Sequence, residues 1–99
     1  MSMFEIQQAP DGAVALVGRL DAAQAAGLQA ALDKVSGAAR LDFGRLEYVS
    51  SAGLGVLLKT QKRLAASGAS LTLFNVSPHI MDVFRYSGFD QIFRIEARA

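Results

Sequence analysis

The sequence predicts an α/β fold: a single domain with a mixed, mostly parallel sheet of about five strands and about three to four helices. Strand-like segments alternate with helix-like ones along most of the chain, as expected when helices join parallel strands. Only a turn at Pro10, Asp11 and Gly12 separates the first two strand-like segments, so these should form a hairpin at the sheet edge. The chain has 99 residues, enough for a modest core, and we expect the domain to span residues 1–99.

The expected strands are short segments with apolar or alternating patterns. They are, in order, residues 3–7, 13–17, 40–43, 70–74 and 92–95. Residues 13–17 are apolar throughout, which is typical of an inner strand covered on both faces. We expect a loop between residue 43 and the following helix, and a frayed tail over residues 96–99.

Capping residues mark the first and third expected helices. The first follows Asp21, whose carboxylate can accept from first-turn amides, and it should stop at Gly37. The third follows Ser77, with Pro78 at its first position, and should stop at Gly88. The apolar stripe of the first helix consists of Ala25, Leu28, Leu32 and Val35.

The second expected helix opens on Ser50 and Ser51 and ends at Gly68. Hydroxyls at a helix start lie near unpaired backbone N–H groups and the positive end of the helix dipole, so a phosphate would be well accommodated there. The plain alternative is that one serine is only the N-cap. The expected buried stripe is Leu54, Leu57, Leu58, Leu64 and Ala65, and the expected outer surface is Val56, Lys59, Thr60, Lys62 and Arg63.

Gly53 and Gly55 lie in the first turns of this helix, where each glycine costs about 1 kcal/mol relative to alanine. Two explanations stay open: close packing of the helix on the sheet, or a bare surface that lets another molecule approach the backbone at the serines. The Gly-Leu-Gly sequence is neither a Walker loop nor a dinucleotide fingerprint.

Composition and charge exclude several classes of function. The net charge is +1 and the basic residues are scattered, which disfavours nucleic-acid binding. The absence of cysteine, with His79 as the only histidine, disfavours disulfides and structural zinc. The sequence has no apolar run of about 20 residues and no secretory signal pattern, so we expect a cytoplasmic protein without a membrane partner.

A serine hydrolase is a third, disfavoured interpretation. Ser51 would need a base, and His79 is expected to be solvated in the first turn of another helix. The chain also lacks a Gly-x-Ser-x-Gly elbow. We therefore expect no enzymatic activity, no metal and no cofactor.

Residues 48–58, Tyr-Val-Ser-Ser-Ala-Gly-Leu-Gly-Val-Leu-Leu, closely resemble the core of the STAS family, the anti-sigma factor antagonists. Residues 18–21 resemble the family's Gly-x-Leu-Asp turn, and residues 41–43 resemble the strand before its phosphorylation loop. Residues 75–89 resemble its third-helix segment, so the resemblance covers nearly the whole chain.

The resemblance implies a phosphorylation switch. In the family, a serine at the start of the second helix is phosphorylated by a partner serine kinase of the histidine-kinase-like ATPase type, which is also an anti-sigma factor. The unphosphorylated antagonist binds the kinase and frees the sigma factor, and a serine phosphatase resets the switch. Alignment on the two glycines places the phosphorylated serine at Ser51. Many members carry Asp one residue earlier, where this chain has Ser50, the second candidate.

The partner-binding surface that the resemblance implies consists of Asp21, Asp42, Ser50, Ser51, Ala52, Gly53, Gly55, Val56 and Lys59. We expect Asp21 and Asp42 to flank the serine at the carboxyl edge of the sheet. The resemblance suggests that Asp21 helps the kinase or nucleotide site of the partner engage, and a plain N-cap is the alternative. The alternative function is a STAS scaffold subunit that is never phosphorylated, for example an accessory of a lipid-transport ATPase. We expect a monomer when the protein is free.

Overall fold

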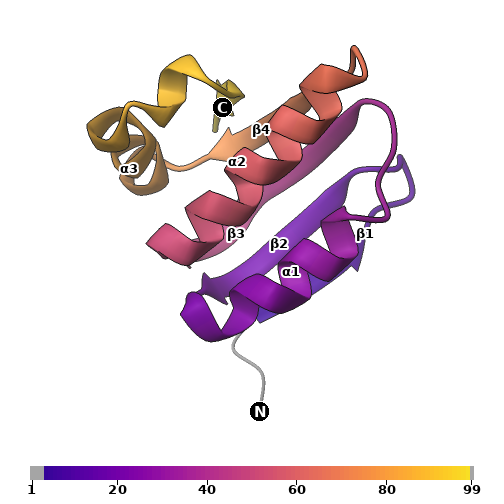
Figure 1. Cartoon of the computed structure of the whole chain (residues 1–99). Helices are drawn as coiled ribbons and strands as arrows, with labels where there is room; N and C mark the ends of the chain where they lie inside the picture. Colours follow the sequence, from indigo (N-terminus) through magenta and orange to yellow (C-terminus); the bar gives the residue numbers. More distant parts are fainter. Residues whose placement is uncertain (1–3, 99) are drawn as a thin grey trace.

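The computed structural model describes residues 4–98, and within them five strands form one sheet in the sequential order β1-β2-β3-β4-β5 (Figure 1). The strands are β1 (Phe4–Gln8), β2 (Val14–Leu20), β3 (Ala39–Val49), β4 (Leu71–Val76) and β5 (Arg94–Ala97). The pair β1 and β2 is antiparallel, and every later neighbour is parallel. The predicted mixed sheet with a hairpin at its edge is confirmed.

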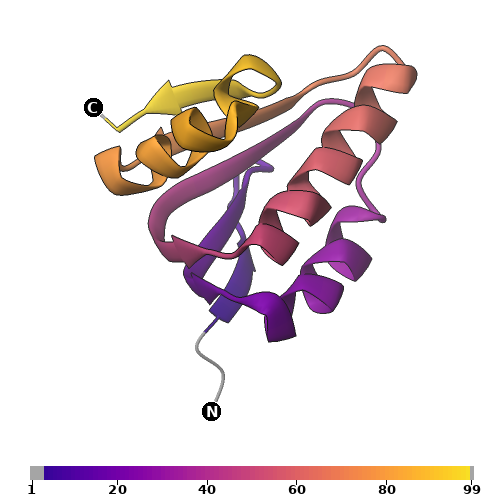
Figure 2. The same cartoon turned by 60° about the vertical axis from the view of Figure 1, so that its left-hand side comes forward.

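A helix joins each parallel pair of strands. These helices are α1 (Ala25–Leu32), α2 (Ser51–Ala66) and α3 (Pro78–Ser87), and short 3-10 turns lie at Ala22–Gln24 and Phe89–Gln91. Since crossovers of this kind are right-handed, a sheet that grows in one direction receives all of its helices on one face. The two views in Figures 1 and 2 show this layer of helices over the sheet.

One apolar core lies between the sheet and the helices. Phe43 of β3 contacts Phe84 of α3, with ring centroids 6.2 Å apart, and Leu57 of α2 and Leu28 of α1 are fully buried in the same cluster. Within residues 4–98, no helix is both long enough and apolar enough to cross a bilayer.

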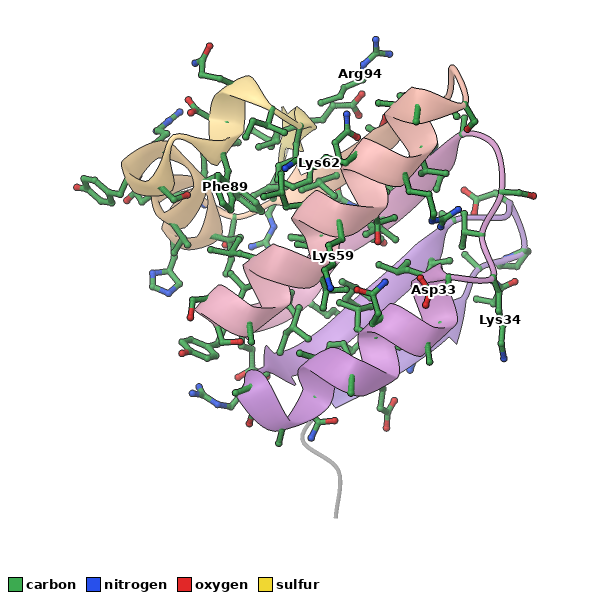
Figure 3. The ribbon with its side chains drawn as sticks, in the orientation of Figure 1. Asp33, Lys34, Lys59, Lys62, Phe89 and Arg94 are labelled. Atoms are coloured by element: carbon green, nitrogen blue, oxygen red, sulfur yellow. The ribbon has the colours of Figure 1, made fainter. Side chains whose placement is uncertain are left out.

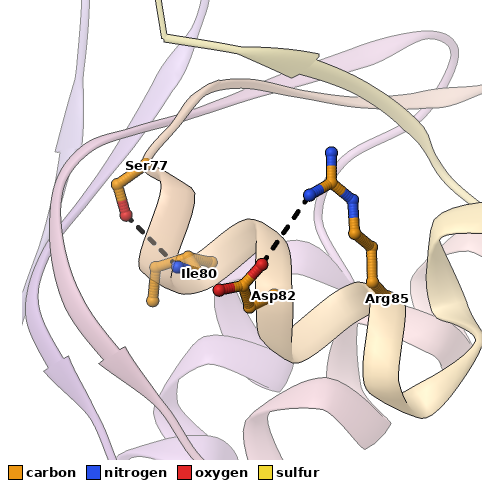
Figure 4. Close-up of polar contacts among 4 residues, drawn as sticks. All are labelled: Ser77, Ile80, Asp82 and Arg85. Carbon is orange, nitrogen blue, oxygen red and sulfur yellow. Dashed lines mark hydrogen bonds and ion pairs between the residues drawn. The ribbon is translucent and has the colours of Figure 1, made fainter.

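Helix α3 has the bounds that its capping residues predict. Ser77 Oγ accepts from the Ile80 backbone N–H at 3.3 Å, and Gly88 ends the helix with φ at 77°. Figure 4 shows this cap and the exposed ion pair between Asp82 and Arg85, at 3.7 Å. An exposed pair of this kind contributes at most about 1 kcal/mol, so the caps define the helix.

Strand β3 is longer than predicted, and the expected loop after residue 43 is wrong. Only Ala39–Asp42 pairs with β4, but β3 continues beside β2 as far as Val49, opposite Leu20. Asp42 lies where β3 and β4 diverge: its Oδ1 accepts from Gly44 N at 2.8 Å and from Asn75 Nδ2 at 3.1 Å. The pairing with β2 thus carries the chain in extended form directly to the start of α2.

Other predicted bounds also differ from the structure: β2 continues to Leu20, β4 continues to Val76, and β5 begins at Arg94. Helix α1 stops at Leu32, before the predicted stop at Gly37. The frayed tail is wrong for the described part of it, because β5 runs to Ala97 and the Arg98 backbone N–H donates to Val76 O at 3.0 Å. Residues 3 and 99, which were assigned to the first strand and to the tail, lie outside the described residues.

Candidate functional site

Ser50 is the single residue between β3 and α2, and its side chain caps the helix. Ser50 Oγ accepts from Gly53 N at 3.1 Å, and the Ser50 backbone N–H donates to Leu20 O at 2.8 Å. The residue is only 8% exposed. Its hydroxyl therefore satisfies one of the unpaired amides of the helix start and faces the protein.

Ser51 is the first residue of α2, and it is exposed. Its side chain is therefore accessible to another molecule at the helix start. The first turn of α2 contains no acidic residue, so the positive end of the helix dipole is not offset locally by a carboxylate. The two adjacent serines thus have different roles: Ser50 is buried and caps the helix, and Ser51 is accessible to another molecule.

We expect Ser50→Ala to lower the free energy of unfolding by about 1 kcal/mol, because it removes the cap from Gly53 N–H. Ser51→Ala should change it by less than about 0.5 kcal/mol, since the side chain is exposed. Urea denaturation of both variants measures the difference. Equal destabilisation by the two substitutions would contradict the assigned roles.

The two glycines of α2 have different surroundings. A Cβ on Gly53 would lie 2.7 Å from Cγ and 2.8 Å from Cδ2 of Leu20, so this glycine permits the close packing of α2 on β2. A Cβ on Gly55 would meet nothing within 4 Å, and the residue is exposed. Packing within the domain thus explains Gly53 and does not explain Gly55.

The other predicted contact residues of α2 divide between surface and core. Ala52 and Lys59 are exposed. Val56 is 8% exposed and packs in the core, so its predicted place on the outer surface is wrong, and its contact with a partner stays a prediction. Thr60 is also buried, at 1%, with its hydroxyl donating to Val56 O, whereas Ala65, predicted buried, is exposed.

Neighbouring α1 accounts for the burial of Val56 and Thr60, which lie on the same side of α2 as Arg63. It packs beside α2, and Arg63 at the end of α2 donates to Leu32 O of α1 at 2.8 Å. The sheet and α1 together cover a wider arc of α2 than the predicted stripe allows. The exposed face that remains consists of Ser51, Ala52, Gly55, Lys59, Lys62 and Arg63, with Ala65 and Ala66 at the helix end.

Asp21 lies at the predicted edge, but Asp42 does not. Asp21 follows Leu20, whose carbonyl accepts from Ser50 N, so it lies at the same end of the sheet as the serines. Its Oδ1 accepts from Ala23 N at 3.1 Å, as the predicted cap does. Asp42 lies seven residues before Val49 on β3, about 23 Å along the strand, and the expectation that it flanks the serine is wrong.

Sequence reasoning missed a stacked pair at this end of the sheet. Arg19 and Tyr48 are paired in register, one position before Leu20 and Val49, and the Arg19 guanidinium lies 4.5 Å from the centroid of the Tyr48 ring. Leu20 and Val49 are buried under the helices, so strand alternation directs the stacked pair to the other face of the sheet. Arg19 and Tyr48 are far apart in the sequence, and only the strand register brings them together.

His79, the candidate base for Ser51, lies at the start of α3. His79 is exposed and lines a surface cavity of about 610 Å³, and none of the residues around that cavity belongs to α2. Among residues 4–98, no group of three or more His, Asp or Glu side chains is placed to hold a metal ion. What this site offers chemically is a serine side chain that is exposed at the start of a helix.

A protein-family model described as Mlab, STAS domain, matches residues 4–95. The chain therefore belongs to the STAS domain family. A protein of Bordetella bronchiseptica that carries the name anti-sigma factor antagonist BtrV is 44% identical over 68 residues. The match covers 69% of this chain and 59% of BtrV, so the chain spans less than two thirds of the length of that relative.

Solved structures share the fold. A Thermotoga maritima protein described as an anti-sigma factor antagonist has a TM-score of 0.76 at 23% identity, over 95% of this chain and 86% of that one. The Bacillus cell fate determinant SpoIIAA in its phosphorylated form has a TM-score of 0.67 at 23% identity, over 93% of this chain and 89% of that one. At this level of identity, the similarity establishes a common fold.

Proposed function

We propose that this chain is an anti-sigma factor antagonist controlled by phosphorylation of Ser51. In its unphosphorylated form it binds a cytoplasmic serine kinase that is also an anti-sigma factor, through the exposed face of α2. Phosphorylation by that kinase ends the binding, and a serine phosphatase restores it. The observation that carries the proposal is the exposure of Ser51 at the first position of α2, next to a buried Ser50.

The helix itself tolerates the modification. A phosphoserine adds about 1.5 to 2 negative charges and three strong acceptor oxygens. At the N-terminus of α2 these meet backbone N–H donors and the positive end of the dipole, with no acidic residue in the first turn to repel them. The phosphorylated domain therefore keeps its fold.

A partner bound to the exposed face of α2 does not tolerate a phosphate on Ser51. The contact must make room for a larger group and remove a dianion from water, which is costly without matching donors. Because Ser51, Ala52 and Gly55 are exposed and small, the partner surface can approach the helix closely, so the added phosphate falls inside the contact. The modification thus acts as a switch without a conformational change.

The relatives support this assignment through their names and fold. BtrV carries the name of an anti-sigma factor antagonist, and SpoIIAA has been solved in a phosphorylated form. In this assignment the chain is a binding protein and its only chemistry is as a substrate of the kinase. Asp21, a cap at the same end of the sheet, contributes to the contact with the partner.

Incubation with the cognate kinase and ATP should place one phosphate on Ser51. The kinase to use is the histidine-kinase-like ATPase encoded nearest to this chain, and the modified residue is located by mass spectrometry. Ser50→Ala should still be phosphorylated, because Ser51 remains exposed, whereas Ser51→Ala should not.

Two outcomes would overturn the assignment in different ways. Phosphate on Ser50 in the wild type would mean that the helix start opens to expose its buried cap. A partner that copurifies stably, does not phosphorylate this chain and binds every Ser51 variant equally well would instead indicate a permanent scaffold subunit.

A further inference from the structure

The exposed face of α2 changes character along its length. Its first half, Ser51, Ala52 and Gly55, is small and uncharged, and its second half carries the exposed lysines Lys59 and Lys62. The whole helix from residue 51 to residue 66 contains no Asp or Glu. Figure 3 shows Lys59 and Lys62 on α2, on the side of the molecule that the helices cover.

The lysines share one face with the serine. At about 100° per residue, Ser51, Gly55, Lys59 and Lys62 fall within an arc of about 80° around the helix axis. Lys59 lies about 12 Å and Lys62 about 17 Å from Ser51 along that axis. A folded partner that covers Ser51 and Gly55 therefore also reaches the lysines, with a different part of its surface.

Neither Lys59 nor Lys62 forms an ion pair within the described chain. Among residues 4–98, the only ion pair within 4.0 Å joins Asp82 and Arg85, on α3. Arg63 is different, because it donates to Leu32 O and ties α2 to α1. The helix dipole favours cations within the last turn, which accounts for Arg63 but not for Lys59 in the middle of the helix.

We propose that the protein partner of this face carries carboxylates opposite Lys59 and Lys62. This inference rests on the proposed function, which makes α2 the docking face, and adds the chemistry of the partner. Two cations without an ion pair, on a helix that contains no acidic residue, favour an acidic protein surface through complementary potentials, which mainly raise the association rate.

The test compares binding kinetics of Lys59→Glu/Lys62→Glu with the wild type, using the purified kinase and surface plasmon resonance at low and physiological salt. The association rate constant should fall by about tenfold or more in the double variant, and the loss should shrink as salt screens the charges. Lys34→Glu, a single charge reversal at an exposed lysine after α1, should change the rate by less than about twofold. Circular dichroism confirms that each variant is folded.

The outcomes separate this inference from the proposed function. If the double variant binds as fast as the wild type at low salt, while Ser51→Asp still weakens binding, the acidic partner surface is wrong and the switch stands. If the wild type does not bind the kinase at all, both are wrong. Restoration of fast binding by replacing partner carboxylates with lysine would identify the opposing groups.

Discussion

The phosphorylated protein should bind its kinase about ten- to a thousandfold more weakly than the unmodified protein, with no loss of stability. Such a decrease corresponds to about 1.4 to 4 kcal/mol of binding free energy, which one desolvated interfacial charge can supply. The phosphate would stand at Ser51, exposed at the positive end of α2, where the host helix offers donors. The effect is measured by isothermal titration calorimetry on protein phosphorylated to completion, with thermal unfolding recorded beside it.

Two substitutions of Ser51 and one of Ser36 serve as controls for the affinity measurement. Ser51→Asp carries one charge and fewer acceptors than phosphoserine, so it should weaken binding less than phosphorylation does. Ser51→Ala should bind close to the wild type and resist the switch. Ser36→Asp adds the same charge at an exposed position after α1 and should leave the affinity unchanged. Equal weakening by Ser36→Asp would mean that net charge, and not the contact at Ser51, controls binding.

Local signals made the fold predictable. Helix α3 has its predicted bounds because Ser77, Pro78 and Gly88 act within their own turns, where neighbouring residues decide the backbone. The parallel sheet was also predictable, because the apolar periodicity of each segment indicates whether that segment is a strand or a helix. Right-handed crossovers then leave few alternatives for the arrangement.

The prediction failed for the second half of β3, where the backbone depends on pairing with a strand that is distant in the sequence. Gly44 and Arg45 interrupt the apolar pattern and indicate a loop, but β2 holds this part of β3 in extended form through Val17 and Gly18. No residue near position 44 in the sequence indicates that this segment pairs with β2. The same extension moves Asp42 away from the serines, because the strand continues for seven residues beyond it.

The segment that forms the site was predictable from the sequence, but the burial of its individual side chains was not. The motif identified the helix start, yet the difference between Ser50 and Ser51 depends on the contact of Ser50 with Leu20 O across the sheet edge. Thr60 and Val56 were both expected on the outer surface, and both are buried. The bond from the Thr60 hydroxyl to Val56 O within the helix permits the burial of this polar side chain.

The two glycines of α2 should respond in opposite ways to alanine. Gly53→Ala is expected to lower the free energy of unfolding by about 1–2 kcal/mol, because overpacking against the fully buried Leu20 outweighs the gain in helix propensity. Gly55→Ala should raise it by up to about 1 kcal/mol, since its new methyl group meets nothing. Gly27→Ala, at an equally open position in α1, should also stabilise the fold. Urea denaturation of the three variants measures these signs.

Binding then separates the two stabilised variants. If a partner approaches the bare backbone at Gly55, the added methyl group holds the surfaces apart and lowers the affinity for the kinase, although the domain is more stable. Gly27→Ala lies on a different helix and should bind as the wild type does. A Gly55→Ala protein that is stabilised and still binds fully would show that the partner does not pack on this turn, and the docking face would have to lie nearer Asp21. A loss of binding in a more stable protein is a result that only a contact at Gly55 explains, because every effect through the fold has the opposite sign.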